Sequence, residues 1–446
     1  MLVPKSDEVL DLTVRHTYGT WRYQRGWKPL HIVDAEGCYF LDAAGKKYLD
    51  FSSQLMCSNL GHKNKAVIDA ICKQAKELPY ISPGFATTVR AELSKSLLKL
   101  LPEGLEKFFF TTSGTEANEA AIKIARLFTG KHKIISRYRS YHGSTAGSIA
   151  ATGDLRRWTA EPVGKMDGVI FAPDADTYRS PFGSDHPNPG IASAEYIDYM
   201  IKNEGNVAAI MLEPVVGTNG VLVPPKEYLP MVREIADKND VLLIADEVMS
   251  GWGRTGEWFA VNHWKVKPDI LTTAKGITGA YAPLGLTATT KEIADYFEDH
   301  YFAHGHTYEA HPLTLAPAVA AIKEYLRLDL ITEAKKKGAY MGKRLSELKE
   351  KHESVGDVRG IGLFWAVELV KNRKTKEPFT NPKDKLSGKA SVLDRMASEM
   401  MSRGVYILNW LSHFVIAPPL IISRNEIDQG IDAVDESLNI SDKEIE

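Results

Sequence analysis

The 446-residue sequence has few cysteines, almost no net charge and no long apolar run. Its three cysteines form no CxxC pair, which excludes a zinc ribbon and favours reduced thiols over a disulfide framework. With 55 basic against 57 acidic side chains, it lacks the cationic excess that nucleic-acid binding needs. No uncharged apolar run approaches the roughly 18 residues of a membrane helix, and acids stand where a signal peptide is apolar. These absences predict a cytoplasmic protein that binds neither nucleic acid nor membranes.

The middle of the chain, from about 65 to 325, alternates helical stretches with short apolar runs. The runs are KFFFT, KIISR, GVIFAP, AAIMLEP, VLLIADE and DILTTAK. Such alternation predicts βαβ units, and therefore an α/β fold with a mostly parallel sheet covered by helices. An antiparallel hairpin is predicted near 30 to 51. After about 328, a charged helical stretch and the strand-like IGLFWAVELV predict a second, smaller domain.

The segment FFFTTSGTEANEAAIKIAR joins a strand to a helix through a small polar turn. Ser113 and Glu116 match the SxxE capping box. Ser113, Gly114 and Thr115 would present N–H groups and hydroxyls at the positive end of the helix, where phosphate groups bind. A well-capped helix without a ligand explains the same pattern.

Two charged residues follow buried-looking strands. Asp246 ends VLLIAD, where an ionised carboxylate needs a partner. A pyridinium nitrogen is one candidate and a purely structural acid is the other, whereas a Walker-B role lacks its GxxxxGK[ST] loop. Lys275 follows DILTTA, where desolvation would lower its pKa and leave an amine able to form a Schiff base, although a solvated lysine is the simpler reading. Their offset of 29 residues is enough for one crossover helix between neighbouring strands, so both could reach one pocket.

A phosphate cradle, a buried Asp and an activated Lys are together the parts that hold pyridoxal phosphate. The strings SGTEANEAAIKIAR, YRSYHGST, LEPVVG, ADEVMSGWGRTGEWF, KPDILTTAKGITGAYAPLG, GHTYEAHPL and APPLIIS also occur in the order found in one family. On these strings the chain resembles the class III pyridoxal-phosphate aminotransferases of fold type I. The resemblance implies a large cofactor-binding domain at 60–327 and a smaller α+β domain formed by 1–59 and 328–446.

The resemblance also implies roles for individual residues. Lys275 would form the Schiff base and move the proton, and Asp246 would pair with the pyridinium nitrogen. Tyr141 would stack on one face of the ring, and Val248 would lie against the other. Thr307 would reach the phosphate from the neighbouring subunit. The cofactor-binding residues so implied are Ser113, Gly114, Thr115, Tyr141, His142, Glu213, Asp246, Val248, Lys275 and Thr307.

The chain departs from parts of the family pattern. Met249 stands where many members carry a Gln that hydrogen-bonds the ring oxygen. LSHFVIAPPLII lacks the Arg with which ornithine-type members bind a substrate carboxylate. The strings YGTWRYQ and SSQLMCSNLGH look more like the ω-amino acid and amine group, which includes taurine and β-alanine aminotransferases. Candidate substrate-pocket residues are Tyr18, Trp21, Met56, Tyr281, Trp410 and His413.

The resemblance therefore implies a ping-pong aminotransferase that moves an amino group from an ω-amino acid or amine to pyruvate or 2-oxoglutarate. A homodimer or a dimer of dimers is expected. An aminomutase or a dialkylglycine-type decarboxylase would keep the same motifs, and a regulatory protein that only binds the cofactor is a further alternative. His300, His304, His306 and His311 fit no zinc spacing, so we expect no metal and assign them to a loop at the dimer interface.

Overall fold

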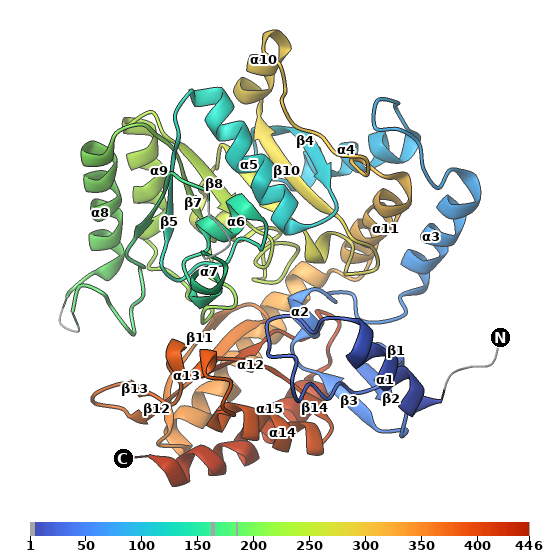
Figure 1. The fold of residues 1–446 in the computed structure, drawn as a ribbon, viewed down its shortest axis with the longest axis vertical. Coiled ribbons are helices and arrows are strands. Elements are labelled where there is room, and N and C mark those ends of the chain that lie inside the picture. The colour runs from blue at the N-terminus through green and yellow to red at the C-terminus, as the bar shows by residue number, and fades with distance from the viewer. Residues whose placement is uncertain (1–4, 162–165, 184–185, 446) are drawn as a thin grey trace.

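The main sheet has seven strands, most of them parallel. A computed structural model describes residues 5–161, 166–183 and 186–445 (Figure 1). In chain order the strands are β4 (Leu105–Thr111), β5 (Lys133–Arg137), β6 (Val169–Ala172), β7 (Val207–Leu212), β8 (Leu242–Asp246), β9 (Ile270–Thr273) and β10 (Gly285–Thr290). Their spatial order is β4-β10-β9-β8-β7-β5-β6. Only β10 runs antiparallel to its neighbours, so the prediction of a mostly parallel sheet is confirmed.

Helices cover both faces of this sheet (Figure 1). The strands β7 and β9 are buried along their whole length, which matches their unbroken apolar or β-branched sequences. The helices of this region are α3 (Lys65–Glu77), α4 (Thr88–Leu100), α5 (Gly114–Thr129), α6 (Ala146–Ala151), α7 (Leu155–Ala160), α8 (Pro189–Glu204), α9 (Tyr228–Lys238), α10 (Lys291–Asp299) and α11 (Pro312–Arg327). The carboxyl ends of β7, β8 and β9 consequently open at one edge, which is where ligands bind in such sheets.

Helix α5 begins where the sequence predicts it. Ser113 is its N-cap, and the Ser113 Oγ accepts a hydrogen bond of 3.3 Å from the N–H of Glu116. The predicted box is only half formed, because the Glu116 carboxylate accepts from the N–H and hydroxyl of Thr112 instead of the Ser113 N–H. The face of α5 that packs on the sheet is buried at Ala117, Ala120, Ala121 and Ile124 and partly buried at Phe128.

The connection between β8 and β9 differs from the expected crossover helix. These strands are parallel neighbours, with Asp246 paired to Thr272, as the sequence argument requires. However, residues 247–269 form turns and one 3-10 helix, Ala260–Trp264. Glycines and polar residues in MSGWGRTGEW favour turns over a continuous helix. The expectation of a crossover helix was therefore wrong.

The two chain ends share a second region. The predicted hairpin is a three-stranded meander of β1 (Ile32–Glu36), β2 (Tyr39–Asp42) and β3 (Lys47–Asp50), and β3 pairs in parallel with β14 (Val405–Tyr406). A second sheet contains β11 (Val355–Ile361), β12 (Phe364–Asn372), β13 (Glu377–Pro378), β15 (Leu408–Trp410) and β16 (His413–Ile416). The predicted strand IGLFWAVELV is split by a turn at Gly362, where φ is 59°. The domain boundaries at 59/60 and 327/328 stay predictions.

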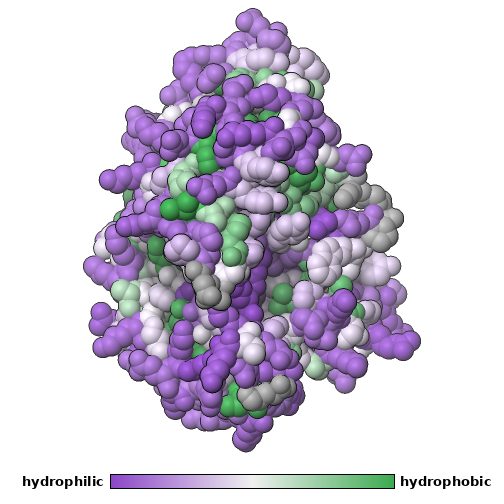
Figure 2. Space-filling view, turned by 90° about the vertical axis from the view of Figure 1, so that its left-hand side faces the viewer, coloured by the Kyte–Doolittle hydropathy of each residue, from purple (hydrophilic) through white to green (hydrophobic). Residues whose placement is uncertain are grey.

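Helices complete this second region. They are α1 (Ser6–His16), α2 (Ser53–Met56), α12 (Leu330–Lys351), α13 (Pro382–Leu386), α14 (Val392–Ser402) and α15 (Arg424–Ser441). One face of the molecule is mainly hydrophilic, with scattered apolar patches (Figure 2). Within the described ranges, no helix has the length and apolarity to cross a membrane.

Candidate functional site

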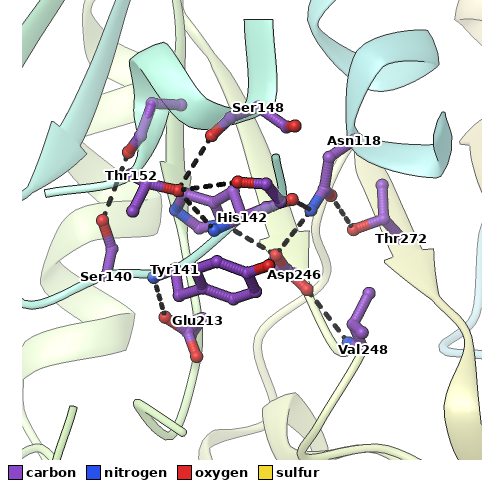
Figure 3. Close-up of polar contacts among 12 residues, drawn as sticks. Asn118, Ser140, Tyr141, His142, Ser148, Thr152, Glu213, Asp246, Val248 and Thr272 are labelled. Carbon is purple, nitrogen blue, oxygen red and sulfur yellow. Dashed lines mark hydrogen bonds and ion pairs between the residues drawn. The ribbon is translucent and has the colours of Figure 1, made fainter. Parts of the chain in front are cut away.

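Asp246 lies at the centre of a buried polar cluster (Figure 3). Its Oδ2 lies 2.7 Å from the Nδ1 of His142 and accepts a bond of 2.8 Å from the Nδ2 of Asn118. Its Oδ1 accepts a bond of 3.0 Å from the N–H of Val248. Because a carboxylate only accepts, His142 Nδ1 carries the proton. The strand end thus holds one carboxylate in a fixed direction.

Asn118 orients this carboxylate, and the sequence analysis missed it. Its Nδ2 also donates to the carbonyl of His142 at 2.7 Å, and its Oδ1 accepts from the Thr272 hydroxyl at 2.6 Å. Asn118 therefore connects α5, the His142 loop and β9. One signal was available: Asn118 is the polar residue on a helix face that otherwise carries Ala117 and Ala121.

Glu213 fixes the loop that carries Tyr141. The Glu213 carboxylate accepts from the N–H of Tyr141 at 3.0 Å and from the N–H of Gly217 at 2.8 Å. Burial raises the pKa of Glu213, and these two N–H bonds and the nearby His142 oppose that rise. Figure 3 shows the Tyr141 ring between Glu213 and Asp246.

Lys275 follows β9 in an unusual backbone conformation. Its φ is 48°, a left-handed value that costs energy for any residue other than glycine. Its side chain is half-buried, and desolvation lowers its pKa, whereas Cys57, Asp246 and Glu213 act in the opposite direction. Lys275 therefore shares its electrostatic environment with the two carboxylates of the cluster and has an increased share of neutral amine.

The start of α5 is packed closely against this cluster. A Cβ at Gly114 would lie 2.8 Å from Val248 Cγ1, and a Cβ at Gly143 would lie 2.1 Å from Thr115 Oγ1. The Thr115 hydroxyl also lies 2.6 Å from the Ser148 hydroxyl. The N–H groups at this helix N-terminus and the neighbouring hydroxyls lie beside Val248 and a strand-end carboxylate, and together they form a donor set that fits a phosphorylated pyridine ring.

Arg156, which follows the N-cap of α7, is the other residue that the sequence analysis missed. Its Cζ lies 4.3 Å from the ring centroid of Tyr141, 4.0 Å from that of Trp410 and 5.6 Å from that of Trp21. Its side chain is buried, and its Nε has no hydrogen-bond partner among the residues that the structure describes. The Oδ2 of Asp154 lies 3.5 Å from its Nη1. Two neighbouring arginines in DLRRW gave no pattern that singled out one of them.

Comparisons with known proteins agree with this geometry. Residues 22–438 match the family model described as aminotransferase class-III. The chain belongs to the class-III aminotransferase family. It is therefore a pyridoxal-phosphate-dependent transaminase that transfers an amino group from a donor to a keto acid, and the predicted family, fold type and cofactor are confirmed.

Similar proteins have differing specificities. A leucine/methionine racemase of Thermococcus litoralis is 35% identical, with 92% of this chain and 91% of the relative covered. A taurine–pyruvate aminotransferase of Bilophila wadsworthia is 34% identical, with 96% of each chain covered. The structure of a taurine:2-oxoglutarate aminotransferase from Bifidobacterium kashiwanohense, in complex with PLP and glutamate, is 37% identical with a TM-score of 0.95, and both chains are covered completely.

The candidate substrate-pocket residues of this aminotransferase lie in different places. Trp21 and Trp410 contact Arg156, and Met56 is buried near Met249 in one apolar cluster. Tyr18 is 92% exposed.

The other two candidates are held by backbone groups. The hydroxyl of Tyr281 donates to the carbonyl of Gly61 at 2.9 Å. His413 is buried with Nε2 2.8 Å from the carbonyl oxygen of Thr218, and burial lowers its pKa to about 4.

Thr307 lies in an exposed turn of this class-III chain. The Tyr80 hydroxyl donates to its carbonyl at 3.1 Å, and no described hydrogen bond joins it to the Asp246 cluster. The four histidines make separate contacts: His304 and His306 pack on Phe109, His300 stacks on Tyr296, and His311 caps α11. Among the residues placed, no three metal-ligating side chains cluster.

Proposed function

We propose that this aminotransferase takes its amino group from an ω-amino acid, passes it to an α-keto acid in a ping-pong reaction, and binds the acid end of the donor with Arg156. The observation that carries the proposal is a buried guanidinium, between Tyr141 and Trp410, whose Nε lacks a partner. A buried guanidinium with an unpaired N–H group favours an anionic ligand. Two relatives named for taurine, an ω-amino sulfonic acid, support this choice.

When bound, pyridoxal phosphate supplies an aldehyde that condenses with amines and a ring that accepts electrons. We assign its phosphate to the start of α5, and Lys275 Nζ to the aldehyde. The proposed contacts are Ser113, Gly114, Thr115, Tyr141, His142, Glu213, Asp246, Val248 and Lys275.

Lys275 Nζ would accept and return a proton at the carbon that carries the amino group. Its lowered pKa favours this exchange, because a neutral amine is the form that accepts a proton. The nearby Asp246 and Glu213 limit the lowering, so that the ammonium form is also accessible.

Asp246 would hold a proton on the ring nitrogen. Its three bonds from Asn118, His142 and Val248 orient the carboxylate before the ring arrives. Such preorganisation avoids a reorganisation cost during the reaction. Tyr141 would cover one ring face and Val248 the other.

Arg156 would place the donor. Its guanidinium lies over Tyr141, so an acid group bound to it points the rest of a short donor toward the ring and Lys275. Trp21 and Trp410 restrict the guanidinium from other sides.

We also propose a homodimer in which Thr307 of each subunit reaches the cofactor phosphate of the other. Exposed aromatic rings support an interface there, because Tyr308 (58% exposed) and Tyr80 (40% exposed) lie edge to face beside Thr307. Light scattering should give twice the chain mass, and a monomer would contradict the proposal.

The free thiols Cys38, Cys57 and Cys72 support a cytoplasmic location, which cell fractionation tests.

The function is tested with matched donors on the cofactor-loaded enzyme. Donors ending in a sulfonate, a carboxylate or a methyl group, of equal length, are each supplied with pyruvate or 2-oxoglutarate, and alanine or glutamate is measured. We expect kcat/KM for acid-ended donors to exceed that of the methyl-ended amine at least about tenfold. Equal rates would refute the assignment of Arg156. Donor conversion without any keto acid would instead indicate racemase or aminomutase chemistry, and release of carbon dioxide a decarboxylase.

A further inference from the structure

A cavity of about 390 Å³ lies on the outer side of Arg156. We call it the outer basic pocket and define it by Trp21, Arg22, Arg156, Lys385 and Trp410. These residues come from the N-terminal segment, α7, α13 and β15. Three of them are cations, and none of the described residues that line the cavity is a carboxylate. A water-accessible pocket with this charge attracts anions.

The two outer cations are only weakly neutralised. Lys385 Nζ lies 3.9 Å from Asp394 Oδ1, which is too far for a hydrogen bond. That carboxylate oxygen already accepts from the Nδ2 of Asn409 at 2.8 Å. Arg22 donates from Nε to the carbonyl of Thr20 at 3.3 Å and takes part in no ion pair between placed residues. Both cations are therefore available to a ligand.

Arg156 and the outer cation Lys385 lie beside the same aromatic ring. Arg156 Cζ and Lys385 Nζ lie 4.0 Å and 5.9 Å from the centroid of the same Trp410 ring. Arg156 also contacts Tyr141, whereas no contact among the described residues joins Lys385 to that ring. Lys385 therefore lies farther than Arg156 from the proposed cofactor site. The pocket thus offers one cation near the reacting centre and a second group of cations beyond it.

We infer that the outer basic pocket binds the second carboxylate of a dicarboxylic α-keto acid, and that the acceptor of this enzyme belongs to the 2-oxoglutarate class. The inference rests on the proposed function. An ω-amino acid has one acid group, which Arg156 alone satisfies. A dicarboxylic keto acid has two, and its outer one requires Lys385 and Arg22. Pyruvate has no second acid group and would gain nothing from these cations.

The first test measures binding without turnover. Glutarate, a non-reacting diacid, and butyrate, its monoacid analogue, are titrated into the cofactor-loaded enzyme while the fluorescence of Trp21 and Trp410 is recorded. In the Arg22→Met/Lys385→Met double variant we expect the glutarate dissociation constant to rise at least about tenfold, and that of butyrate to change by less than about twofold. Lys383→Met is the control, since Lys383 is exposed on the same helix and outside the pocket.

The second test measures the acceptor half-reaction. Enzyme loaded with the amine form of the vitamin is mixed with 2-oxoglutarate or pyruvate. In the double variant, the second-order rate constant should fall at least about tenfold with 2-oxoglutarate and should hardly change with pyruvate. Unchanged glutarate binding, or an equal loss with both keto acids, would overturn the inference, as would an equal loss in Lys383→Met.

Failure of the proposed function gives a different result. Both tests omit the amino donor, so they report on the pocket even if no ω-amino acid is a substrate. If the acid-ended donors fail while glutarate still binds through Lys385 and Arg22, the donor assignment falls and the pocket assignment stands. If the donors succeed and the double variant binds glutarate normally, only the pocket assignment falls.

Discussion

Asp246, at the centre of the inner cluster, and Arg156, at the centre of the outer cluster that lines the outer basic pocket, are both buried, but they differ in how well their charges are satisfied. Asp246 accepts from three donors at 2.7 to 3.0 Å. Arg156 has aromatic faces around it, one carboxylate oxygen at 3.5 Å and an Nε without a partner. A satisfied cluster is already organised for a permanent ligand, whereas an unsatisfied cation is organised for a ligand that comes and goes.

The two clusters also differ in the elements that carry them. Most of the inner residues stand at the ends of β7, β8 and β9 or on the long helix α5, and the loop after β5 supplies Tyr141 and His142. The outer ones come from the short helices α7 and α13, the N-terminal segment and β15. Sites on strands and long helices keep their geometry, and sites on short segments adapt to alternating substrates. A ping-pong enzyme needs both properties.

The largest effect is expected from removing the lysine of the inner cluster. Lys275→Ala deletes the amine that we propose moves the proton, so turnover should fall about 10⁴-fold or more. The visible absorbance that arises when cofactor and lysine combine should also disappear. Turnover within tenfold of the natural enzyme would contradict the role.

A smaller effect is expected from neutralising the anion opposite the lysine. Asp246→Asn keeps the shape but cannot hold a proton on the ring nitrogen, so kcat should fall about 10²- to 10³-fold. Glu247→Gln is the matched control, because Glu247 is the adjacent buried carboxylate and bonds to Ser250 and Val261 rather than to the cluster. Similar losses in both variants would show that burial alone, and not the charge of Asp246, is responsible.

A change in the outer cluster should weaken the use of the substrate without weakening the binding of the cofactor. Arg156→Met should reduce kcat/KM for acid-ended donors about 10- to 100-fold while changing cofactor affinity by less than about twofold. Arg157→Met is the control, since that guanidinium lies over Phe171 instead. A fall in cofactor affinity that matches the fall in kcat/KM would erase the distinction between the two clusters.

The smallest effect concerns stability. Burial raises the pKa of Glu247 from its ordinary value of 4.5 to about 7. A raised pKa means that the folded state prefers the protonated acid, so this contribution is complete below pH 4.5 and is lost as pH rises through 7. Glu247→Gln cannot ionise, so it does not lose this contribution at high pH. The free energy of unfolding of the variant minus that of the natural enzyme should therefore be up to about 3 kcal/mol larger at pH 8 than at pH 4.5. Urea unfolding at both pH values measures this, and a difference independent of pH would refute it.

The sequence predicted those features that depend on local pattern. Apolar runs located the strands, and the position of Asp246 and Lys275 after two of them brought both to one sheet edge. The sequence pattern did not indicate Asn118 and Arg156, because their contacts are with residues far away in the chain, namely Asp246, Trp21 and Trp410. The missing helix between β8 and β9 has a related cause, since residue spacing gives the length of a connection but not its conformation.

The central claim, that the inner cluster fixes the cofactor on one lysine, is tested most directly by borohydride reduction of the cofactor-loaded enzyme followed by peptide mapping. We expect one labelled peptide, the one that contains Lys275, and no label in Lys275→Ala. Label on a different lysine of the natural enzyme, or none at all, would contradict it.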